Sequence, residues 1–420
     1  MRSISMRRLA CWAALALGPG VGCGGSDGSG VGHNPVAAPA DNVAELSVDY
    51  GLPGIGYVNG LFTTVTVCVP GTSDCQSIDH LIVDTGSSGL RVLGSVLALS
   101  LPASTNASGG VLAECDQLLS GFTWGPLRLA DLTIAGERAS SLPIQVIEES
   151  TYPVPSDCTG VDADTAEVLG SNGILGVASD AQDCGTACTA RPGSTSNPGI
   201  YYACSSAEPG GCSPTAVPLA QQMTNPVTLF PQDNNGTIIE LPAVPAQGAP
   251  QVTGSLVFGI GTRANNGLGQ AGVLHLNNYG MFTTRYPAGS NLWYGAILDS
   301  GSNFLYFLDS PTTDIPLCPD PNSFLYCPAS TMNLSATNQD SVGLAAVTVK
   351  FSIANLDALS THPQNIAFNN IGGPSTMPDS ASASDLLLFD WGMPFFFGRN
   401  VYTAIEDRST PSGAGPFVAF

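Results

Sequence analysis

Positive charge is scarce in this sequence. Lys350 is the only lysine among 420 residues, and 12 lysines and arginines stand against 33 aspartates and glutamates, a formal net charge of −21. A field of this sign repels the phosphates of nucleic acids and of anionic lipid headgroups. The composition therefore argues against nucleic acid as a partner, and against binding to a membrane surface through charge.

Metal-ligand spacings and long helical segments are missing as well. No Cys-x-x-Cys occurs and the four histidines are scattered, so we expect no metal site and no other cofactor. Short apolar runs alternate with turns in a chain of 49 glycines and 32 prolines, which predicts a mainly β protein. The clearest strand candidates are residues 61–68, 80–83, 142–147, 254–258 and 347–353.

The first 23 residues are typical of an export signal. Arginines precede the apolar run Leu9–Leu17, which is too short for a membrane helix, and small residues lead to Cys23. This start resembles a bacterial lipoprotein signal, although Gly20 stands where an aliphatic residue is usual. We expect lipidation of Cys23 and a flexible tether over residues 24–42, in an exported envelope lipoprotein, with the outer membrane as the expected location. Ordinary secretion is the alternative.

Without Cys11 and Cys23, ten cysteines remain. An even number of cysteines in an exported chain favours disulfides over a metal site. Close couples predict the bonds of Cys68 with Cys75 and of Cys318 with Cys327, whereas the connectivity within residues 184–212 stays open.

A weak internal repeat is the strongest signal in the sequence. An apolar strand leads into Asp84-Thr-Gly-Ser-Ser88, and the same pattern returns at Asp299-Ser-Gly-Ser302. Two apolar residues and a glycine follow each copy, ending at Gly176 and at Gly398, which gives intervals of 176 − 84 = 92 and 398 − 299 = 99. The repeat predicts two similar lobes, residues 43–225 and 226–420, each with one Asp loop.

Each residue type in these loops suits a carboxylate pair. Glycine lets the backbone turn tightly beside the carboxylate. A hydroxyl before the glycine can bridge the two loops, and a hydroxyl after it can hold the outer carboxylate oxygen. Two adjacent carboxylates share a proton, so Asp84 and Asp299 together can act as base and acid on a water molecule. The supporting residues are Thr85, Gly86 and Ser87 in the first loop and Ser300, Gly301 and Ser302 in the second.

These segments together resemble the pepsin-like aspartic proteases. The sequence from Asp84 is similar to the first active-site motif of that family, and the sequence from Asp299 is similar to the second. Asn172–Val177 resembles the segment packed beneath the first aspartate, and Pro394–Ile405 resembles the late C-terminal strand. The motif order is similar over residues 55–420. The chain also resembles a bacterial family described only as a domain of unknown function.

Three positions depart from the family pattern. Arg91 stands where a tryptophan usually supports the flap over the substrate, and Arg399 stands beside Gly398 where an aspartate is common. The best flap candidate is the segment around Trp124, at which the family has a tyrosine. A buried strand aromatic is the alternative role for this tryptophan.

The resemblance implies an exported aspartic endopeptidase with two pseudo-symmetric β-rich lobes around a central cleft. It would act as a monomer on a peptide or protein substrate. A catalytically silent pepsin-like binding or inhibitor module is the main alternative, and the completeness of both Asp loops favours the enzyme. A serine hydrolase would need a nucleophile elbow between a strand and a helix, together with a histidine partner. The repeat of Asp loops gives no support to that third option.

Overall fold

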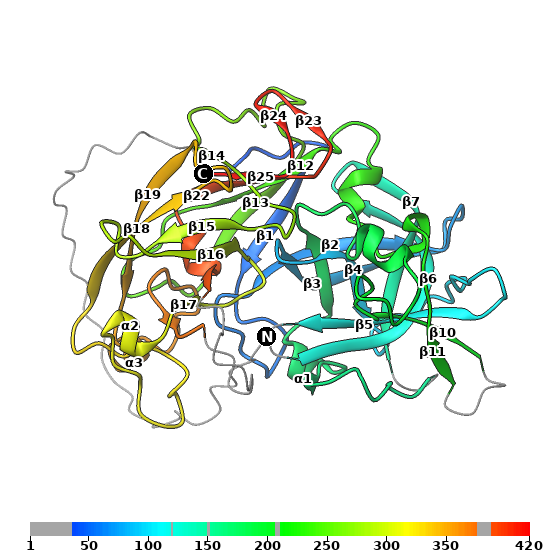
Figure 1. Ribbon diagram of the computed structural model, residues 1–420, viewed down its shortest axis with the longest axis horizontal. Coiled ribbons are helices and arrows are strands. Elements are labelled where there is room, and N and C mark those ends of the chain that lie inside the picture. The colour runs from blue at the N-terminus through cyan, green and yellow to red at the C-terminus, as the bar shows by residue number, and fades with distance from the viewer. Residues whose placement is uncertain (1–35, 119–120, 149–151, 206–210, 376–387) are drawn as a thin grey trace, which may run out of the picture.

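The computed structural model describes residues 36–118, 121–148, 152–205, 211–375 and 388–420. Cys23 and most of the expected tether lie outside these residues. The described chain forms two β-rich halves side by side, with its earlier part in one half and its later part in the other (Figure 1). The expected mainly β fold with two lobes is confirmed.

Short strands with alternating burial build the first half. In β2 the apolar residues Leu61, Val65 and Val67 point into the core while polar threonines lie between them, the pattern of a half-buried strand. The elements are β1 Val43–Val48, β2 Leu61–Cys68, β3 Cys75–Asp84, β4 Ser88–Leu93, β5 Val111–Leu118, β6 Gly121–Ile134, β7 Glu137–Ile147, β8 Val161–Asp162, α1 Ala166–Leu169, β9 Gly173–Val177, η1 Gly185–Thr189, β10 Tyr201–Cys204, β11 Cys212–Pro214, η2 Leu219–Gln221 and η3 Pro226–Leu229.

The second half has the same character, with strands joined by short helical turns. Its elements are β12 Gly236–Leu241, β13 Val252–Phe258, β14 Val273–His275, β15 Phe282–Arg285, β16 Trp293–Leu298, β17 Leu305–Phe307, α2 Ser310–Thr313, β18 Met332–Gln339, β19 Ala346–Ile353, α3 Leu356–Ser360, β20 Gly372–Gly373, β21 Phe389–Trp391, η4 Met393–Phe395, β22 Arg399–Ala404, β23 Ser409–Thr410, β24 Gly413–Ala414 and β25 Phe417–Ala419. Seven of these strands form their own sheet in the order β19-β18-β15-β16-β21-β17-β20.

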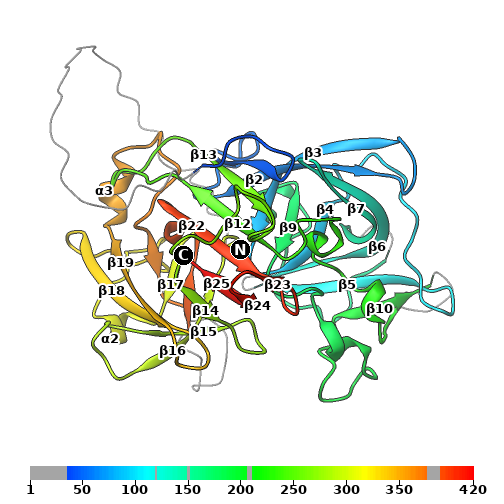
Figure 2. The same cartoon turned by 90° about the horizontal axis from the view of Figure 1, so that it is seen from above.

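One large sheet joins the two halves through β1. All six residues of β1 pair with β13, from Val43 opposite Val257 to Val48 opposite Val252, and the last two also pair with β2. The resulting 16-stranded sheet continues from β13 through β12, β22 and β25 to β14. Figure 2 shows β12, β13 and β22 in the middle of the molecule. The halves therefore share a backbone hydrogen-bond network.

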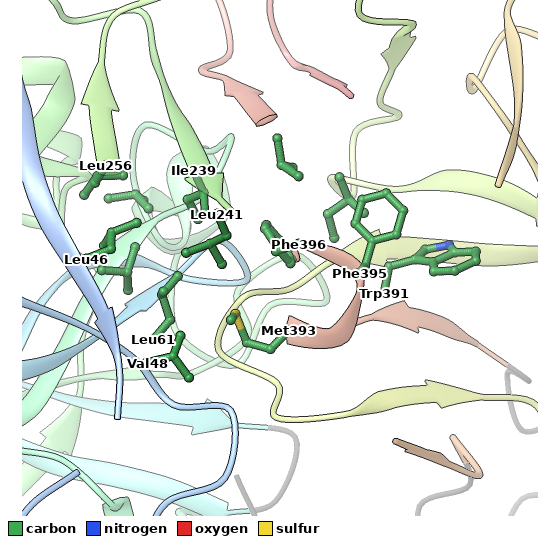
Figure 3. Packing of buried hydrophobic residues seen from close by; sticks show 14 of the residues in the cluster. Leu46, Val48, Leu61, Ile239, Leu241, Leu256, Trp391, Met393, Phe395 and Phe396 are labelled. Atoms are coloured by element: carbon green, nitrogen blue, oxygen red, sulfur yellow. The ribbon is translucent and has the colours of Figure 1, made fainter. Parts of the chain in front are cut away.

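The hydrophobic core also runs through both halves. Figure 3 shows Leu46 and Leu61 from the first half close to Ile239, Leu241 and Met393 from the second. Burying an apolar side chain of this size contributes about 1.5–3 kcal/mol. Because many such residues lie at the junction, the core fixes how the two Asp loops are placed relative to each other.

The last residues of the expected tether are not free. The backbone N–H of Ala37 donates to Glu240 Oε2 at 2.7 Å, and Asn42 is fully buried. The Asn42 amide donates to the carbonyl of Phe258 at 2.9 Å. The boundary expected at residue 42 is therefore too late, because residues 37–42 already dock on the second half.

Disulfides join all ten cysteines that the structure describes. The two predicted bonds, of Cys68 with Cys75 and of Cys318 with Cys327, are present. Within residues 184–212, where the sequence left the connectivity open, Cys184 is bonded to Cys188 and Cys204 to Cys212. The fifth bond joins Cys115 to Cys158.

Candidate active site

The two Asp loops begin where β3 and β16 end. Asp84 is the last residue of β3, and Asp299 directly follows β16. β9 pairs in parallel with β3, and β21 pairs in parallel with β16. On its other edge, β9 pairs antiparallel with β4, and β21 pairs antiparallel with β17. The same three-strand arrangement therefore presents each aspartate.

The threonine and serine after the aspartates bind the loops to each other. Thr85 Oγ1 donates to the carbonyl of Leu298 at 2.9 Å and accepts from the N–H of Ser300 at 3.0 Å. Ser300 Oγ donates to the carbonyl of Val83 at 2.7 Å and accepts from the N–H of Thr85 at 3.1 Å. These four reciprocal hydrogen bonds follow a local two-fold relation, and they hold each loop against the other.

Each carboxyl group is held by the residues that follow it. Gly86 N–H donates to Asp84 Oδ1 at 2.8 Å, and Ser87 Oγ donates to Oδ2 at 2.5 Å. The second loop repeats this, because the N–H of its glycine donates to Asp299 Oδ1 at 2.8 Å and Ser302 Oγ lies 2.7 Å from Oδ2. Backbone and hydroxyl donors thus fix the orientation of both carboxyl groups.

Gly86 shows how closely the two carboxyl groups approach each other. A Cβ at this position would lie 2.9 Å from Asp299 Oδ1 and 3.2 Å from Asp84 Oδ1. One oxygen of each carboxyl group therefore lies within van der Waals distance of the same position beside Gly86. Both aspartates are nearly buried. Burial raises the pKa of Asp84 to about 7, and the charge of Asp299 and a hydrogen bond with it contribute. A pair of this kind holds one proton near neutrality.

The structure corrects the second half of the sequence repeat. Gly176 lies opposite Asp84 on β9, but the strand beside Asp299 is β21, which leads to Gly392 rather than to Gly398. A Cβ on Gly176 would meet the carbonyl of Ser87 at 2.7 Å, and a Cβ on Gly392 would meet the carbonyl of Ser302 at 2.7 Å. The equivalent intervals are thus 176 − 84 = 92 and 392 − 299 = 93.

Arg399 consequently does not occupy the position assigned to it. The residue after the matching glycine is Met393, which is buried in the core. The guanidinium of Arg399 lies 4.4 Å above the Phe395 ring, and Nη1 donates to the carbonyl of that residue. Arg399, the first residue of β22, therefore packs on η4 and takes no part in the contacts of Asp84 and Asp299 described above.

The segment expected to form the flap lies in a hairpin of β5 and β6, but Trp124 is not placed to contact a substrate. β5 and β6 pair from Ala113 opposite Pro126 to Leu118 opposite Gly121. Trp124 is fully buried, packs edge-to-face on Tyr202 and donates from Nε1 to the carbonyl of Tyr152 at 2.9 Å. A side chain enclosed in this way cannot contact a substrate, so the alternative of a buried strand aromatic is correct.

Arg91 supports the hairpin through charge instead. Its Nη2 donates to Glu114 Oε1 at 2.9 Å, and Nε lies 3.0 Å from Asp116 Oδ2, both residues of β5. Arg91 is fully buried, and its Nη1 donates to the carbonyl of Ser88 at 3.0 Å. The sequence analysis missed this cluster, although the alternation of Glu114 and Asp116 within β5 could have indicated it.

Further carboxyl groups complete the cluster under the hairpin. Tyr201 Oη donates to Asp183 Oδ1 at 2.7 Å. Burial raises the pKa of Glu114 well above its ordinary value, against the opposing effect of Arg91, and it also raises the pKa of Asp183. A hydrogen bond joins Glu114 to Asp183, so one proton is shared there.

Two kinds of site are not found in the described part of the chain. There, no group of three or more histidine, cysteine, aspartate or glutamate side chains is arranged to hold a metal ion. Within the same ranges, no helix has the length and apolar character needed to cross a membrane.

Comparison with known proteins places the fold. The aspartic proteinase from Irpex lacteus has a similar crystal structure, with 14% sequence identity and a TM-score of 0.52, over 90% of this chain and 96% of that chain. At this identity the likeness concerns the fold alone, which is pepsin-like. No curated protein matches the sequence. A family described as "Protein of unknown function (DUF3443)" matches residues 38–420, and the chain therefore belongs to the DUF3443 family.

Proposed function

We propose that this protein is an aspartic endopeptidase with Asp84 and Asp299 as its catalytic pair. One observation carries the proposal: two equivalent loops bring two nearly buried carboxyl groups together, each oriented by an N–H and a serine hydroxyl. The four hydrogen bonds between the loops support it further. A binding module would not need this complete set of contacts.

The chemistry follows from the shared proton. The ionised carboxyl of the pair takes a proton from a water molecule, whose oxygen attacks the carbon of the peptide carbonyl. The protonated carboxyl gives its proton to the carbonyl oxygen, and a tetrahedral diol forms. When the C–N bond breaks, a proton passes to the leaving amine and the carboxylic acid product is released. No covalent bond between enzyme and substrate is needed.

The pH dependence tests this mechanism. The pair must hold one proton, and the pKa of Asp84 is raised to about 7 by burial and by Asp299. We expect purified protein to cleave an unfolded protein mixture at acid pH and to lose activity as pH rises through about 7.

Asp84→Asn and Asp299→Asn should each abolish cleavage while keeping the fold, because either change removes the base and acid pair. Asp357→Asn, at an exposed carboxyl on α3, is the matched control and should leave the rate unchanged. A peptide analogue with a hydroxyl in place of the attacking water should inhibit. A folded protein that cleaves nothing at any acid pH would instead be a binding module.

The place of action is part of the proposal. Five disulfides suit an oxidising compartment. We propose export through the N-terminal signal and anchoring by a lipid on Cys23. A palmitate analogue should label wild-type cells and leave Cys23→Ala unlabelled, and equal labelling of both would instead indicate ordinary secretion.

A further inference from the structure

A third carboxyl group lies directly behind the second Asp loop. Asp390 is the middle residue of β21, and only 1% of it is exposed. Ser302 Oγ lies 2.7 Å from Asp390 Oδ2. The Ser302 hydroxyl oxygen also lies 2.7 Å from Asp299 Oδ2. A chain of carboxyl, hydroxyl and carboxyl therefore runs from β21 to the catalytic pair.

Counting hydrogens shows that this chain needs an additional proton. The Ser302 hydroxyl has one hydrogen, so it can donate to only one of the two carboxyl oxygens. If both carboxyl groups were ionised, the other oxygen would face the hydroxyl lone pairs at 2.7 Å. One carboxyl group must therefore carry a proton and donate it to Ser302.

The surroundings decide which carboxyl group keeps the proton. Asp299 accepts from the N–H of Gly301, whereas Asp390 Oδ1 has no hydrogen-bond partner. In the described part of the chain, none of the ion pairs involves Asp390. Ionisation of an unpartnered, buried carboxyl costs more than ionisation of a partnered one.

The two carboxyl groups of the catalytic pair act on Asp390 in the same direction. Burial raises the pKa of Asp390 well above its ordinary value, and the negative charges of Asp299 and Asp84 raise it further, against the lowering effect of Ser302. Across the ladder, Asp390 lies opposite Ile297 of β16 and Tyr306 of β17, so neither strand places a cation at its register position.

The first half of the molecule shows that the fold does not require this carboxyl. By the equivalence of Gly176 with Gly392, Asp390 corresponds to Ile174, which lies opposite Ile82 on β3 as Asp390 lies opposite Ile297 on β16. Ile174 is fully buried in an apolar cluster. An apolar residue thus satisfies the packing at the equivalent position, and the carboxyl group of Asp390 needs another reason.

We infer that Asp390 is a positioning residue of the catalytic centre: it stays protonated while the pair works, donates to Ser302, and so directs the Ser302 hydrogen to Asp299. The inference rests on the proposed peptidase function. It makes the centre a set of three carboxyl groups that holds two protons, one on Asp390 and one shared by Asp84 and Asp299. It also makes the two halves unequal, since Ser87 has an apolar residue behind it.

Infrared difference spectra test the protonation without any turnover. Between about pH 5 and about pH 9, wild type should keep a protonated-carboxyl band that Asp390→Asn lacks. Asp357→Asn, at the exposed carboxyl on α3, is the control and should leave this band in place. Equal bands in wild type and Asp390→Asn would overturn the assignment. Should that variant not fold, Asp183→Asn protein labelled with ¹³C at the aspartate carboxyls should keep a protonated aspartate band at about pH 9, because Asp84 has by then lost its proton. Loss of that band would overturn the assignment.

A kinetic comparison tests the positioning. Asp390→Ile, which copies the first half, should lower kcat by roughly fivefold to tenfold with little change in KM, the effect of one lost hydrogen bond. Asp390→Asn, whose amide can still donate to Ser302, should recover part of that loss. Wild-type kcat and pH profile in Asp390→Ile would overturn the role. A protein that is inactive in every form would contradict the peptidase function, and the spectra would still decide the protonation of Asp390.

Discussion

At the scale of single residues, the candidate site depends on the absence of a side chain at Gly86. Gly86 has no Cβ, and a Cβ there would press on Asp299 Oδ1 at 2.9 Å and on Asp299 Cγ at 3.0 Å. Such a contact is shorter than van der Waals distance, so one carboxyl group would have to move. The close approach of the two aspartates therefore requires glycine for space, and not only for the turn expected from the sequence.

We predict that Gly86→Ala lowers kcat by about 100-fold, because displacement of a catalytic group by about 1 Å has an effect of this size. The free energy of unfolding should fall by only about 1–3 kcal/mol, as for other overpacked positions. Gly289→Ala is the control, because a Cβ there meets nothing within 4 Å. Steady-state kinetics and urea unfolding of both variants measure these effects, and wild-type kinetics for Gly86→Ala would contradict the prediction.

Arg91 is the second residue whose replacement has a defined cost. Arg91→Leu would leave Glu114 and Asp116 buried without their cation. Removing one partner of a buried ion pair destabilises by about 3–5 kcal/mol. Arg191→Leu is the control, since this exposed arginine forms no ion pair in the described part of the chain and should change stability by about 0.5 kcal/mol or less. Denaturant unfolding that gave equal losses for both would show that the Arg91 cluster does not support the hairpin.

At the scale of elements, the sequence located β2, β3, β7, β13 and β19, and the segment that pairs with β3 beside Asp84. Alternating apolar residues located β2 and β19, because one face of each strand is buried. β21 was missed, and the pattern of two apolar residues and a glycine was assigned to Phe396–Gly398. The reason is that Asp390 interrupts the apolar run of β21, so the strand that supports Asp299 did not match the pattern.

The hairpin also depended on distant residues that no local pattern shows. One face of the hairpin packs on Tyr202 and on the disulfides of Cys115 with Cys158 and of Cys204 with Cys212. Glu114 and Asp116 on its other face pair with Arg91 of β4. Cys115 of β5 is bonded to Cys158, which is 43 positions later. Sequence spacing alone could suggest this couple, but the register that brings Trp124 opposite Cys115 comes only from the folded hairpin.

We predict that this disulfide stabilises the hairpin more than a short-range one. Chain entropy gives about 4 kcal/mol for a loop of this length and about 2 kcal/mol for that of Cys184 with Cys188. Replacing both cysteines of each pair by alanine should therefore lower stability by about 2 kcal/mol more at the first pair. Hydrogen exchange should localise the change to amides of β5 and β6. Faster exchange in the second half alone would contradict this assignment.

At the scale of the whole molecule, the two halves behave as one unit. β1 pairs with β13 along its full length, residues 37–42 dock on the second half, and the main core runs through both halves. The sequence repeat predicted two lobes, but not this shared sheet, because strand pairing between distant segments leaves no periodic signal. A cut between the halves would expose apolar surface of the shared core, so neither half is expected to be stable alone. A cut at residue 42 would expose the surface of the second half that residues 37–42 cover.

The last prediction is that the folded protein is most stable at acid pH. Burial raises the pKa of Asp84 and of Glu240 to about 7, and it raises the pKa of Asp390 and Glu114 well above their ordinary values. Above about pH 4 the unfolded chain has released these protons while the folded chain still holds them. Because the folded state then binds more protons, the free energy of unfolding falls as pH rises, by up to about 1.4 kcal/mol per proton and pH unit.

This decline should extend from about pH 4 to about pH 7 and continue above it where Asp390 and Glu114 remain protonated. The self-repulsion of a chain with a formal charge of −21 adds to it. Urea unfolding at several pH values measures the slope, and Glu240→Gln, which removes one of the raised pKa values, should reduce it between about pH 4 and about pH 7. Stability that rose steadily toward pH 7 would mean that these carboxyl groups ionise in the folded protein. It would also remove the proton that the proposed catalytic pair requires.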